Sequence, residues 1–275
     1  MNNAVDVLVL GGGPGGYTAA LYAARAGLSV LVLERLSAGG QMATTGTVEN
    51  YPGFEDGVDG FELGEKMQRQ AQRFGARTVL AEVREVALTE SPKRVETDRG
   101  TFLGRTVVVA TGAEARELGV PGEAALRGRG VSYCATCDGM FYRGRPIVVA
   151  GNAPDLKEET EYLRGIGCLV TEARLPGMTI LGDGGKATGV RTAKGEEIPC
   201  EGVFLLRDTL APAQLAPGLE LEGKHIRVDR HMATNLPGVF AAGDCTGEPL
   251  QLAKAVGEGQ MAAHSAIRYL DSIKK

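Results

Sequence analysis

The start of the chain contains the pattern that most restricts how it can fold. Residues 5–10, VDVLVL, form an unbroken apolar run, which is typical of a strand buried on both faces of a parallel sheet. Gly11, Gly13 and Gly16 follow in G-x-G-x-x-G spacing, and the small residues of YTAALYAARAG then predict a helix. A second apolar run, SVLVLE, ends at Glu34, where an acidic side chain can accept hydrogen bonds from a ribose diol. Strand, glycine loop, helix, strand and acid in this order predict a dinucleotide-binding fold, with a pyrophosphate at the helix N-terminus.

The composition is that of an ordinary globular protein and excludes several classes. The chain has 275 residues, 43% of them apolar, and a formal charge of only -4. It has no basic stripe with interleaved aromatic residues, so nucleic acid is not an expected partner. The most apolar stretch, VDVLVLGGGPGG, lacks a basic flank and breaks into glycines, so we expect neither a signal peptide nor a membrane span. We therefore expect a cytoplasmic protein, in whose reducing compartment a close pair of cysteines favours catalysis or metal binding over a structural disulfide.

Two further fragments indicate which dinucleotide is bound. RTVVVATGAEAR places Thr111 and Gly112 at the end of another buried strand, and TNLPGVFAAGDC carries a strand over residues 239–242 into Gly243 and Asp244. This combination resembles the flavin disulfide reductases, in which the A-T-G turn packs beside FAD and the Asp of G-D binds the ribityl chain. The resemblance implies that Asp244 is an FAD ligand and that the helix after it begins beside the isoalloxazine. A simple NAD-binding protein is the alternative, and it would leave the distant G-D motif without a role.

The segment VSYCATCDG contains a close pair of cysteines. Cys134 and Cys137 have C-x-x-C spacing, which allows a disulfide over a small loop and lowers the pKa of one thiol, and Asp138 follows directly as a possible proton donor. A metal site would need a second pair of ligands, but the remaining cysteines and the three histidines are scattered singly, so no metal is predicted. We interpret the pair as a redox centre. The isolated cysteines, which we expect to be small core residues, are Cys168, Cys200 and Cys245.

SYCATCDGMFYRGR resembles the active site of the low-molecular-weight thioredoxin reductases, and GGQM (39–42) and VENYPGF (48–54) resemble flavin-contacting segments of that family. The resemblance implies that Cys137 faces the flavin, that Cys134 attacks the disulfide of a bound thioredoxin and that Asp138 is the acid–base residue. It also implies a homodimer and places Arg129 near the surface that docks thioredoxin. The residues expected to bind FAD are Gly11, Gly13, Pro14, Gly15, Gly16, Glu34, Gly40, Gln41, Asn50, Thr111, Gly112, Gly243, Asp244, Gln251 and Leu252.

The family resemblance implies an α/β fold with two Rossmann-like, three-layer ββα domains, the second inserted into the first. We expect residues 1–114 and 232–275 to form the FAD domain and residues 115–231 to form a smaller inserted domain with the C-x-x-C pair. In the family, the inserted domain also binds NADPH and rotates about hinges, which we expect near residues 113–116 and 231–234.

The inserted domain retains only part of a nucleotide-binding unit. A strand over residues 147–150, a helix in DLKEETEYLRGIG and a strand in CLVTEA are expected, but the family's G-x-G-x-x-A becomes Gly151, Ala153 and Leu156. Ala153 puts a Cβ where a pyrophosphate would approach, and Pro154 removes an N–H donor. Asp155 is expected to cap the helix and would repel a phosphate.

Two further features of this domain argue against an NADPH site. Where NADPH-using members have a basic H-R-R run, this chain has Glu172 and a single arginine, Arg174; such an acid can hold an NADH ribose but disfavours a 2′-phosphate. The remainder up to GVFLLR has room for a hairpin and a loop only.

These defects predict that the NADPH site is lost and that the electrons come from another donor. The chain in this respect resembles the ferredoxin-dependent flavin thioredoxin reductases, in which reduced ferredoxin passes single electrons to FAD. Ferredoxins are generally acidic, so a basic docking surface is expected, with candidates Arg127, Arg129, Arg143, Arg145 and Arg164. Three alternatives remain: a reductase that uses NADH or NADPH through an unusual loop, a dithiol oxidase that passes electrons to oxygen, and a non-catalytic flavin-bound scaffold.

Overall fold

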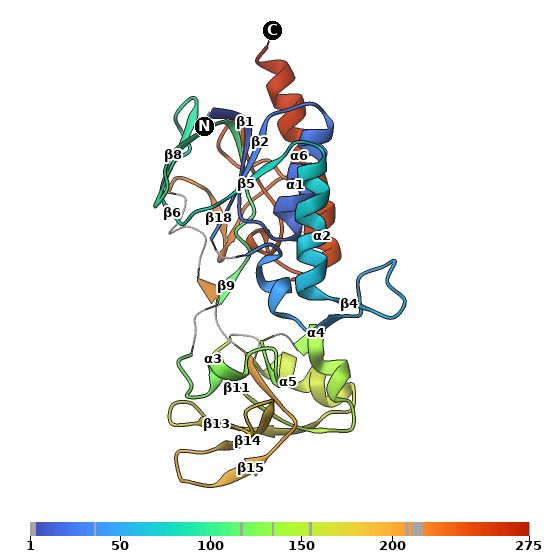
Figure 1. The fold of residues 1–275 in the computed structure, drawn as a ribbon. Coiled ribbons are helices and arrows are strands. Elements are labelled where there is room, and N and C mark those ends of the chain that lie inside the picture. Colours follow the sequence, from blue (N-terminus) through green and yellow to red (C-terminus); the bar gives the residue numbers. More distant parts are fainter. Residues whose placement is uncertain are drawn as a thin grey trace. The chain divides into compact units, whose positions relative to one another are not determined.

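The computed structural model describes residues 4–35, 37–115, 118–133, 135–153, 156–206, 209–210 and 217–274. The chain divides into two compact units, one formed by Met1–Glu114 together with Ala211–Lys275 and the other by Ala115–Leu210 (Figure 1). The first unit is therefore discontinuous in sequence, and the second is inserted into it.

The chain returns to the first unit at residue 211, about twenty residues before the expected boundary at 232. Described residues upstream of 232 pack in this unit: Leu219 and Ile226 belong to one of its core clusters. Asn235 joins the same region, since its side chain accepts a hydrogen bond from the main-chain N–H of Glu220 at 2.9 Å. The expected hinge over residues 231–234 is likewise part of this unit, because Asp229 Oδ1 accepts hydrogen bonds from the N–H groups of residues 231 and 233 at 2.8 and 2.9 Å.

A twisted sheet of seven strands forms the centre of the first unit. Its order is β5-β2-β1-β8-β7-β6; β8 pairs in parallel with β1 and antiparallel with β7, and its end also pairs in parallel with β20. The strands are β1 (Ala4–Leu10), β2 (Val30–Glu34), β5 (Arg77–Leu80), β6 (Val83–Ala87), β7 (Lys93–Thr97), β8 (Gly100–Val109) and β20 (Val239–Ala241). Two short ribbons accompany it, formed by β3 (Thr47–Val48) with β4 (Val58–Asp59) and by β18 (Leu221–Glu222) with β19 (His225–Ile226).

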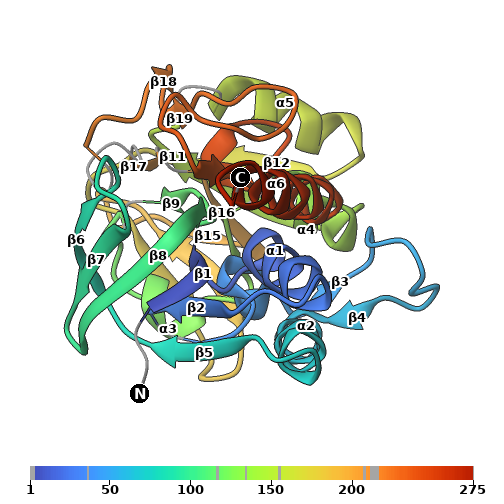
Figure 2. The same ribbon diagram turned by 90° about the horizontal axis from the view of Figure 1, so that it is seen from above.

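Both faces of this sheet are covered, which explains the unbroken apolar run in β1. Val7 and Val9 pack with the helices on one face, and Leu8 and Leu10 pack on the other face with Val86 and Val95 of β6 and β7, among others. Figures 1 and 2 show the three long helices side by side on the first of these faces. They are α1 (Pro14–Arg25), α2 (Gly60–Arg73) and α6 (Leu252–Ser272), and the short 3-10 helices η1 (Gly40–Thr44) and η4 (Asp244–Thr246) complete the unit.

The second unit is a smaller three-layer arrangement around a parallel sheet with the order β10-β16-β11-β12. Val148 of β11 packs on one face with Ile180 and Val190 of the antiparallel sheet β13-β14-β15, and Ile147 packs on the other face with Leu163 of α5. Its strands are β10 (Val131–Ser132), β11 (Pro146–Gly151), β12 (Leu169–Glu172), β13 (Thr179–Gly182), β14 (Ala187–Arg191), β15 (Glu197–Pro199) and β16 (Gly202–Leu206). Its helices are α3 (Glu123–Leu126), α4 (Ala135–Asp138), η2 (Gly139–Tyr142) and α5 (Leu156–Gly165), and β9 (Glu114–Ala115) pairs with β17 (Thr209–Leu210).

The strand–helix–strand unit β11-α5-β12 confirms the remnant of a nucleotide-binding fold that the sequence predicts. The segment expected to form one hairpin instead forms three strands, because β15 adds to the edge of β14. Residues 173–201, all of which are described, contain no helix, so no further helical crossover follows β12.

Candidate functional site

The glycine loop between β1 and α1 contains glycines of two kinds. Some allow close packing of the protein, and one faces open space. A Cβ added to Gly11 would overlap the carbonyl oxygen of Ala110, and one added to Gly16 would overlap the carbonyl oxygen of Gly11. A Cβ added to Gly13 would meet no protein atom within 4 Å. The first and third glycines therefore allow the strand and helix to pack, and the second leaves room for a ligand against the main chain.

The N-terminus of α1 is chemically suited to an anion. Its N-cap residue, Gly13, has no side chain with which to cap the helix, Pro14 occupies the first position, and no acidic residue lies in the first turn. The first N–H groups of a helix have no partner within the helix, and the helix dipole adds a partial positive charge to them. Gly13 keeps this end of the helix free of a side chain, so a pyrophosphate can approach it.

Glu34 lies where the sequence places it, at the end of β2 and against the glycine loop. The residue is only 9% exposed, and its Oε2 accepts a hydrogen bond from the N–H of Gly12 at 2.6 Å. This bond fixes the carboxylate beside the loop, at the carboxyl ends of the parallel strands, where dinucleotides bind in such folds.

The other residues expected around FAD in the first half of the chain gather at the same loop. The N–H of Gly39 donates to the carbonyl of Gly12 at 2.8 Å, and a Cβ on Gly40 would lie 3.5 Å from the Cα of Gly13. Gln41 follows, and its side-chain Nε2 donates a hydrogen bond to the carbonyl of Ala113. Ala113 directly follows the A-T-G turn of Thr111 and Gly112, so η1 joins this turn to the glycine loop.

The distant G-D motif also reaches this site. Gly15 lies against β20 and α6, since a Cβ added to it would come within 3.4 Å of the carbonyl oxygen of Ala242 and 3.3 Å of that of Ala255. Asp244, the first residue of η4, therefore lies two residues after this contact. Burial raises the pKa of Asp244, and the nearby Lys254 ammonium opposes that shift.

The start of α6 completes the predicted set. Asn50 Nδ2 donates to Oε1 of Gln251, the N-cap residue of α6, at 3.0 Å. Leu252 packs against the core cluster that contains Met42 of η1. All the residues expected to bind FAD thus lie in one unit, around the carboxyl ends of β1, β2, β8 and β20. The open space at Gly13 and the uncapped helix end fit the pyrophosphate of FAD, and the buried carboxylate of Glu34 fits a ribose.

In the second unit the structure describes several residues next to the C-x-x-C motif. Cys134 lies outside the described residues, and only the main chain of Cys137 is described, within α4. Ala135 is fully buried, and a Cβ on Gly139 would lie 2.8 Å from both Leu163 and Ile166, so the segment packs tightly on α5 and the turn after it.

Asp138, at the end of α4, has a buried hydrogen-bond donor. Ser132 of β10 is 5% exposed and donates from Oγ to Asp138 Oδ2 at 2.7 Å. Burial raises the pKa of Asp138, and the bond from Ser132 opposes that rise because it favours the carboxylate. A carboxyl group that keeps its proton to higher pH than usual can supply that proton to a leaving thiolate.

The main chain of the remnant nucleotide loop after β11 is bonded to the end of β16. The N–H groups of Asn152 and Ala153 both donate to the carbonyl oxygen of Leu206, at 3.0 and 3.2 Å. A Cβ added to Gly151 would overlap the same oxygen, so this glycine serves the packing of β11 on β16. Pro154 and Asp155 lie outside the described residues.

The acid predicted at the end of β12 is paired within the protein. Arg164 Nη2 lies 2.6 Å from Glu172 Oε1, and Nη1 lies 2.6 Å from Glu161 Oε1. Arg164 is therefore engaged by two carboxylates, both on the second unit.

The basic residues expected at a docking surface are only partly brought together. Arg129 and Arg145 line one cavity of about 330 Å³, together with Phe141, Tyr142 and Lys186 among others. The guanidinium of Arg127 instead stacks over Tyr133, at 5.3 Å from the ring centre.

The isolated cysteines are core residues, as expected. Cys168, Cys200 and Cys245 are all buried and free. Burial raises the pKa of Cys200 to about 11 and that of Cys245 to about 12, so neither thiol is reactive near neutral pH.

Sequence reasoning missed three polar residues at these sites. Ser132 stands inside the quoted cysteine motif, and its hydroxyl close to Asp138 was a usable signal. Lys254 and Glu258 form an ion pair of 3.2 Å on α6 at the helical spacing of four residues, which is visible in the sequence.

Neither a metal centre nor a membrane span is found in the part of the chain that the structure describes. No three His, Cys, Asp or Glu side chains there are grouped so that they could hold a metal ion. Within the same residues, no helix has the length and apolarity needed to cross a membrane.

Comparison with known proteins gives a consistent result. Residues 5–179 and 171–259 match the family described as Pyridine nucleotide-disulphide oxidoreductase. The chain is 40% identical to a thioredoxin reductase of Listeria innocua, over 98% of this chain and 95% of that protein. Its structure is similar to the crystal structure of thioredoxin reductase from Streptococcus pyogenes, with a TM-score of 0.87 and 33% identity over 99% of this chain and 100% of that one.

A further solved structure, a Ferredoxin-Flavin Thioredoxin Reductase from Clostridium acetobutylicum, is similar with a TM-score of 0.61 and 31% identity, over 98% and 99% of the two chains. The match to the family over most of the chain and the identity to its members agree with the glycine loop, the G-D motif and the C-x-x-C pair. The chain belongs to the pyridine nucleotide-disulphide oxidoreductases and, among them, to the low-molecular-weight thioredoxin reductase family, whose members use FAD.

Proposed function

We propose that this thioredoxin reductase takes its electrons from reduced ferredoxin rather than from NADPH or NADH. Two reduced ferredoxins give one electron each, and one disulfide of thioredoxin takes up both electrons with two protons to become a dithiol. FAD, when bound, supplies the conversion between single electrons and an electron pair.

The disulfide chemistry is assigned to residues of the inserted unit. The Cys134 thiolate attacks one sulfur of the thioredoxin disulfide, and the sulfur that leaves takes a proton from Asp138. Cys137 then attacks the sulfur of Cys134, which releases the thioredoxin dithiol and leaves a Cys134–Cys137 disulfide. Bound FAD would supply the two electrons that reduce this disulfide again, and Cys137 would be the sulfur nearer to it.

The loop after β11 is the observation that carries the proposed donor. A pyrophosphate in a Rossmann-type site is held by main-chain N–H groups of the glycine loop and the helix N-terminus. Here the N–H groups of Asn152 and Ala153 are already bonded to the Leu206 carbonyl. Ala153 also adds a methyl group where a nucleotide-binding loop needs a glycine. These features take up two main-chain donors and part of the space that a pyridine nucleotide would use.

The end of β12 gives independent support. A 2′-phosphate is held by basic side chains, but Glu172 stands at this position and binds Arg164 at 2.6 Å. A phosphate here would meet the negative charge of Glu172 and would compete for an arginine that two carboxylates already engage.

The described features of the proposed flavin site support FAD binding, in contrast to those of the nucleotide loop. The chain has thus kept the site of electron storage and lost the features of a hydride-donor site. The Clostridium acetobutylicum protein that is similar to this chain is named for both ferredoxin and flavin. From the resemblance to the low-molecular-weight thioredoxin reductases we also propose a cytoplasmic homodimer. We assign Arg129 and Arg145, which line one cavity, to the docking of protein partners.

The proposal is tested by measuring the formation of thioredoxin thiols under anaerobic conditions with three donors in parallel: NADPH, NADH and photochemically reduced ferredoxin. Only ferredoxin should produce thiols at a catalytic rate, and Cys134→Ser should abolish that rate while it leaves FAD bound. Equal rates with NADPH or NADH would contradict the proposed donor. A separate assay in air excludes the oxidase alternative if dithiothreitol does not drive rapid oxygen consumption.

A further inference from the structure

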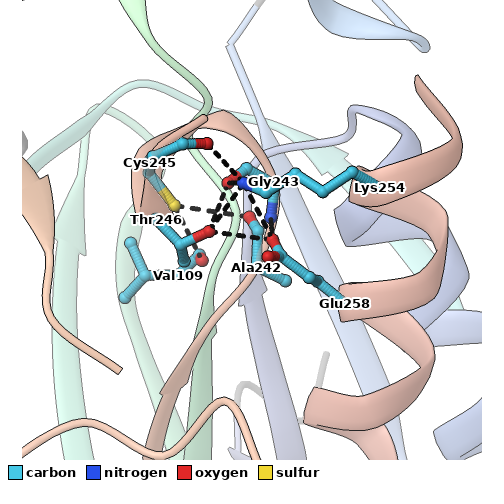
Figure 3. A network of polar contacts seen from close by, with 8 residues as sticks. Val109, Ala242, Gly243, Cys245, Thr246, Lys254 and Glu258 are labelled. Carbon is cyan, nitrogen blue, oxygen red and sulfur yellow. Dashed lines mark hydrogen bonds and ion pairs between the residues drawn. The ribbon is translucent and has the colours of Figure 1, made fainter. Parts of the chain in front are cut away.

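Two charged side chains of α6, Lys254 and Glu258, meet at the turn that precedes this helix (Figure 3). Their side chains are only 15% and 18% exposed, and Nζ of the lysine lies 3.2 Å from Oε2 of the glutamate. The pair lies in the FAD unit, on the helix that follows the G-D motif.

Lys254 binds three acceptors on residues 243–247, a segment that we call the GDCTG turn. Its ammonium group donates to the carbonyl of Gly243 at 3.0 Å, to Oγ1 of Thr246 at 3.0 Å and to the carbonyl of Gly247 at 2.5 Å. A single side chain thus connects both ends of the GDCTG turn.

Glu258 holds the same turn through its opposite charge. Its Oε2 accepts a hydrogen bond from the N–H of Gly243 at 2.9 Å and lies 2.8 Å from Oγ1 of Thr246. The hydroxyl of Thr246 also lies 2.7 Å from the carbonyl of Gly243, so its one hydrogen is directed to one of these two oxygens. The main chain at Gly243 is therefore bound at both its N–H and its carbonyl.

The conformation of the GDCTG turn requires this support. Gly243 and Gly247 have φ angles of 87° and 110°, in the region that favours glycine. Glycine reaches these φ angles because its main chain is flexible. The main chain alone therefore does not hold the turn in one conformation. The residue held between these glycines, Asp244, is the one proposed to bind the ribityl chain of FAD.

Stability alone explains the pair poorly. Lys254 is the third residue of α6, where a positive charge opposes the helix dipole. A buried ion pair, moreover, contributes little to stability compared with well-packed apolar side chains of similar volume. Apolar side chains, however, could not form hydrogen bonds with the N–H and carbonyl groups of the GDCTG turn.

We propose that Lys254 and Glu258 are positioning residues for FAD: they hold the GDCTG turn in the conformation that presents Asp244 to the cofactor. The inference rests on the proposed function and on the assignment of Asp244 to FAD, which the family resemblance implies, and it does not depend on the identity of the electron donor.

Titration of the apoprotein with FAD tests the proposal, with flavin fluorescence as the readout. Lys254→Met should raise the dissociation constant for FAD at least tenfold. Lys66→Met is the matched control, because Lys66 pairs with Glu62 at the same helical spacing and 2.8 Å on the exposed face of α2. This control should leave the dissociation constant unchanged. A Lys254→Met apoprotein that is folded and binds FAD within twofold of the wild type would overturn the proposal.

A double-mutant cycle with Asp244→Asn shows whether the lysine acts through Asp244. Positioning predicts that Lys254→Met causes no more than a twofold further loss of affinity once Asp244 has been changed, whereas a full tenfold loss in that background would refute it. Glu258→Gln removes the charge of the glutamate but keeps an oxygen acceptor for the N–H of Gly243. This variant replaces Lys254→Met in the titration if Lys254→Met does not fold. It should weaken FAD binding at least threefold, and an unchanged affinity would also refute the proposal. Ferredoxin takes no part in these titrations, so failure of the proposed donor would not affect them.

Discussion

Two glycines only three residues apart, Gly13 and Gly16, should respond in opposite ways to the same substitution. A Cβ at Gly16 overlaps a main-chain oxygen of Gly11, and a Cβ at Gly13 has no protein atom within 4 Å. We therefore predict that Gly16→Ala damages the fold and that Gly13→Ala damages only the binding of FAD.

The magnitudes follow from the geometry. Within a helix, alanine is favoured over glycine by about 1 kcal/mol. Overpacking costs about 1–3 kcal/mol, and the upper end applies to Gly16 because a main-chain atom of Gly11 must move. The expected net loss for Gly16→Ala is thus about 2 kcal/mol in the free energy of unfolding. Gly13 has φ −80°, which alanine adopts readily, so the loss of this N-cap glycine should cost less than about 1 kcal/mol.

The assay combines urea denaturation of the two apoproteins with titration by FAD. The methyl group in Gly13→Ala should occupy the space of the pyrophosphate and raise the dissociation constant at least tenfold, which corresponds to about 1.4 kcal/mol. Gly16→Ala should lower the urea midpoint of the apoprotein. Normal FAD affinity in Gly13→Ala, or an undiminished urea midpoint in Gly16→Ala, would refute the assignment of the two glycines.

Three other predictions concern the cysteines and their acid. Ser132→Ala removes a hydrogen bond that favours the carboxylate of Asp138, so this acid should keep its proton to higher pH. The alkaline limb of the pH–rate profile for thioredoxin reduction should therefore move to higher pH. Ser132→Thr, which keeps a hydroxyl, should return the limb to its original pH. A limb that stays in place or moves downwards would contradict this role. Cys134→Ser should leave a Cys137 thiolate against oxidised flavin, seen as a long-wavelength charge-transfer band whose absence, with FAD bound, would exclude Cys137 as the flavin-facing thiol. Cys245 should resist alkylation at pH 8 until the protein is unfolded, as peptide mass spectrometry can show.

Local patterns in the sequence were sufficient to predict the elements that build the FAD unit. The apolar runs at residues 5–10 and 29–34 correspond to β1 and β2, and the run expected over 239–242 corresponds to β20. These strands are buried on both faces, so their sequences are unbroken and their glycine-rich ends mark the carboxyl edge of the sheet. The glycine loop, the A-T-G turn and the G-D motif could be proposed as a flavin site for the same reason, because each follows such a strand. Gln41 and Asn50 rest on the family resemblance instead.

Features that depend on contacts between distant segments could not be predicted. Residues 217–231 contain no boundary signal, and their place in the FAD unit rests on the packing of Leu219 and Ile226 with residues far away in the chain. The closing of the remnant loop depends on Leu206, more than fifty residues beyond Asn152. The sequence shows which side chains a loop carries. The hydrogen-bond partners of its main-chain N–H groups are determined by the tertiary fold.

The most direct test of the central claim is an anaerobic titration in which absorbance near the oxidised maximum of the flavin reports its reduction. NADPH and NADH, each in large excess, should leave the flavin oxidised, and reduced ferredoxin added to the same sample should bleach it. Rapid bleaching by either nucleotide would contradict the claim, since it would show that the loop closed by Leu206 still admits a hydride donor.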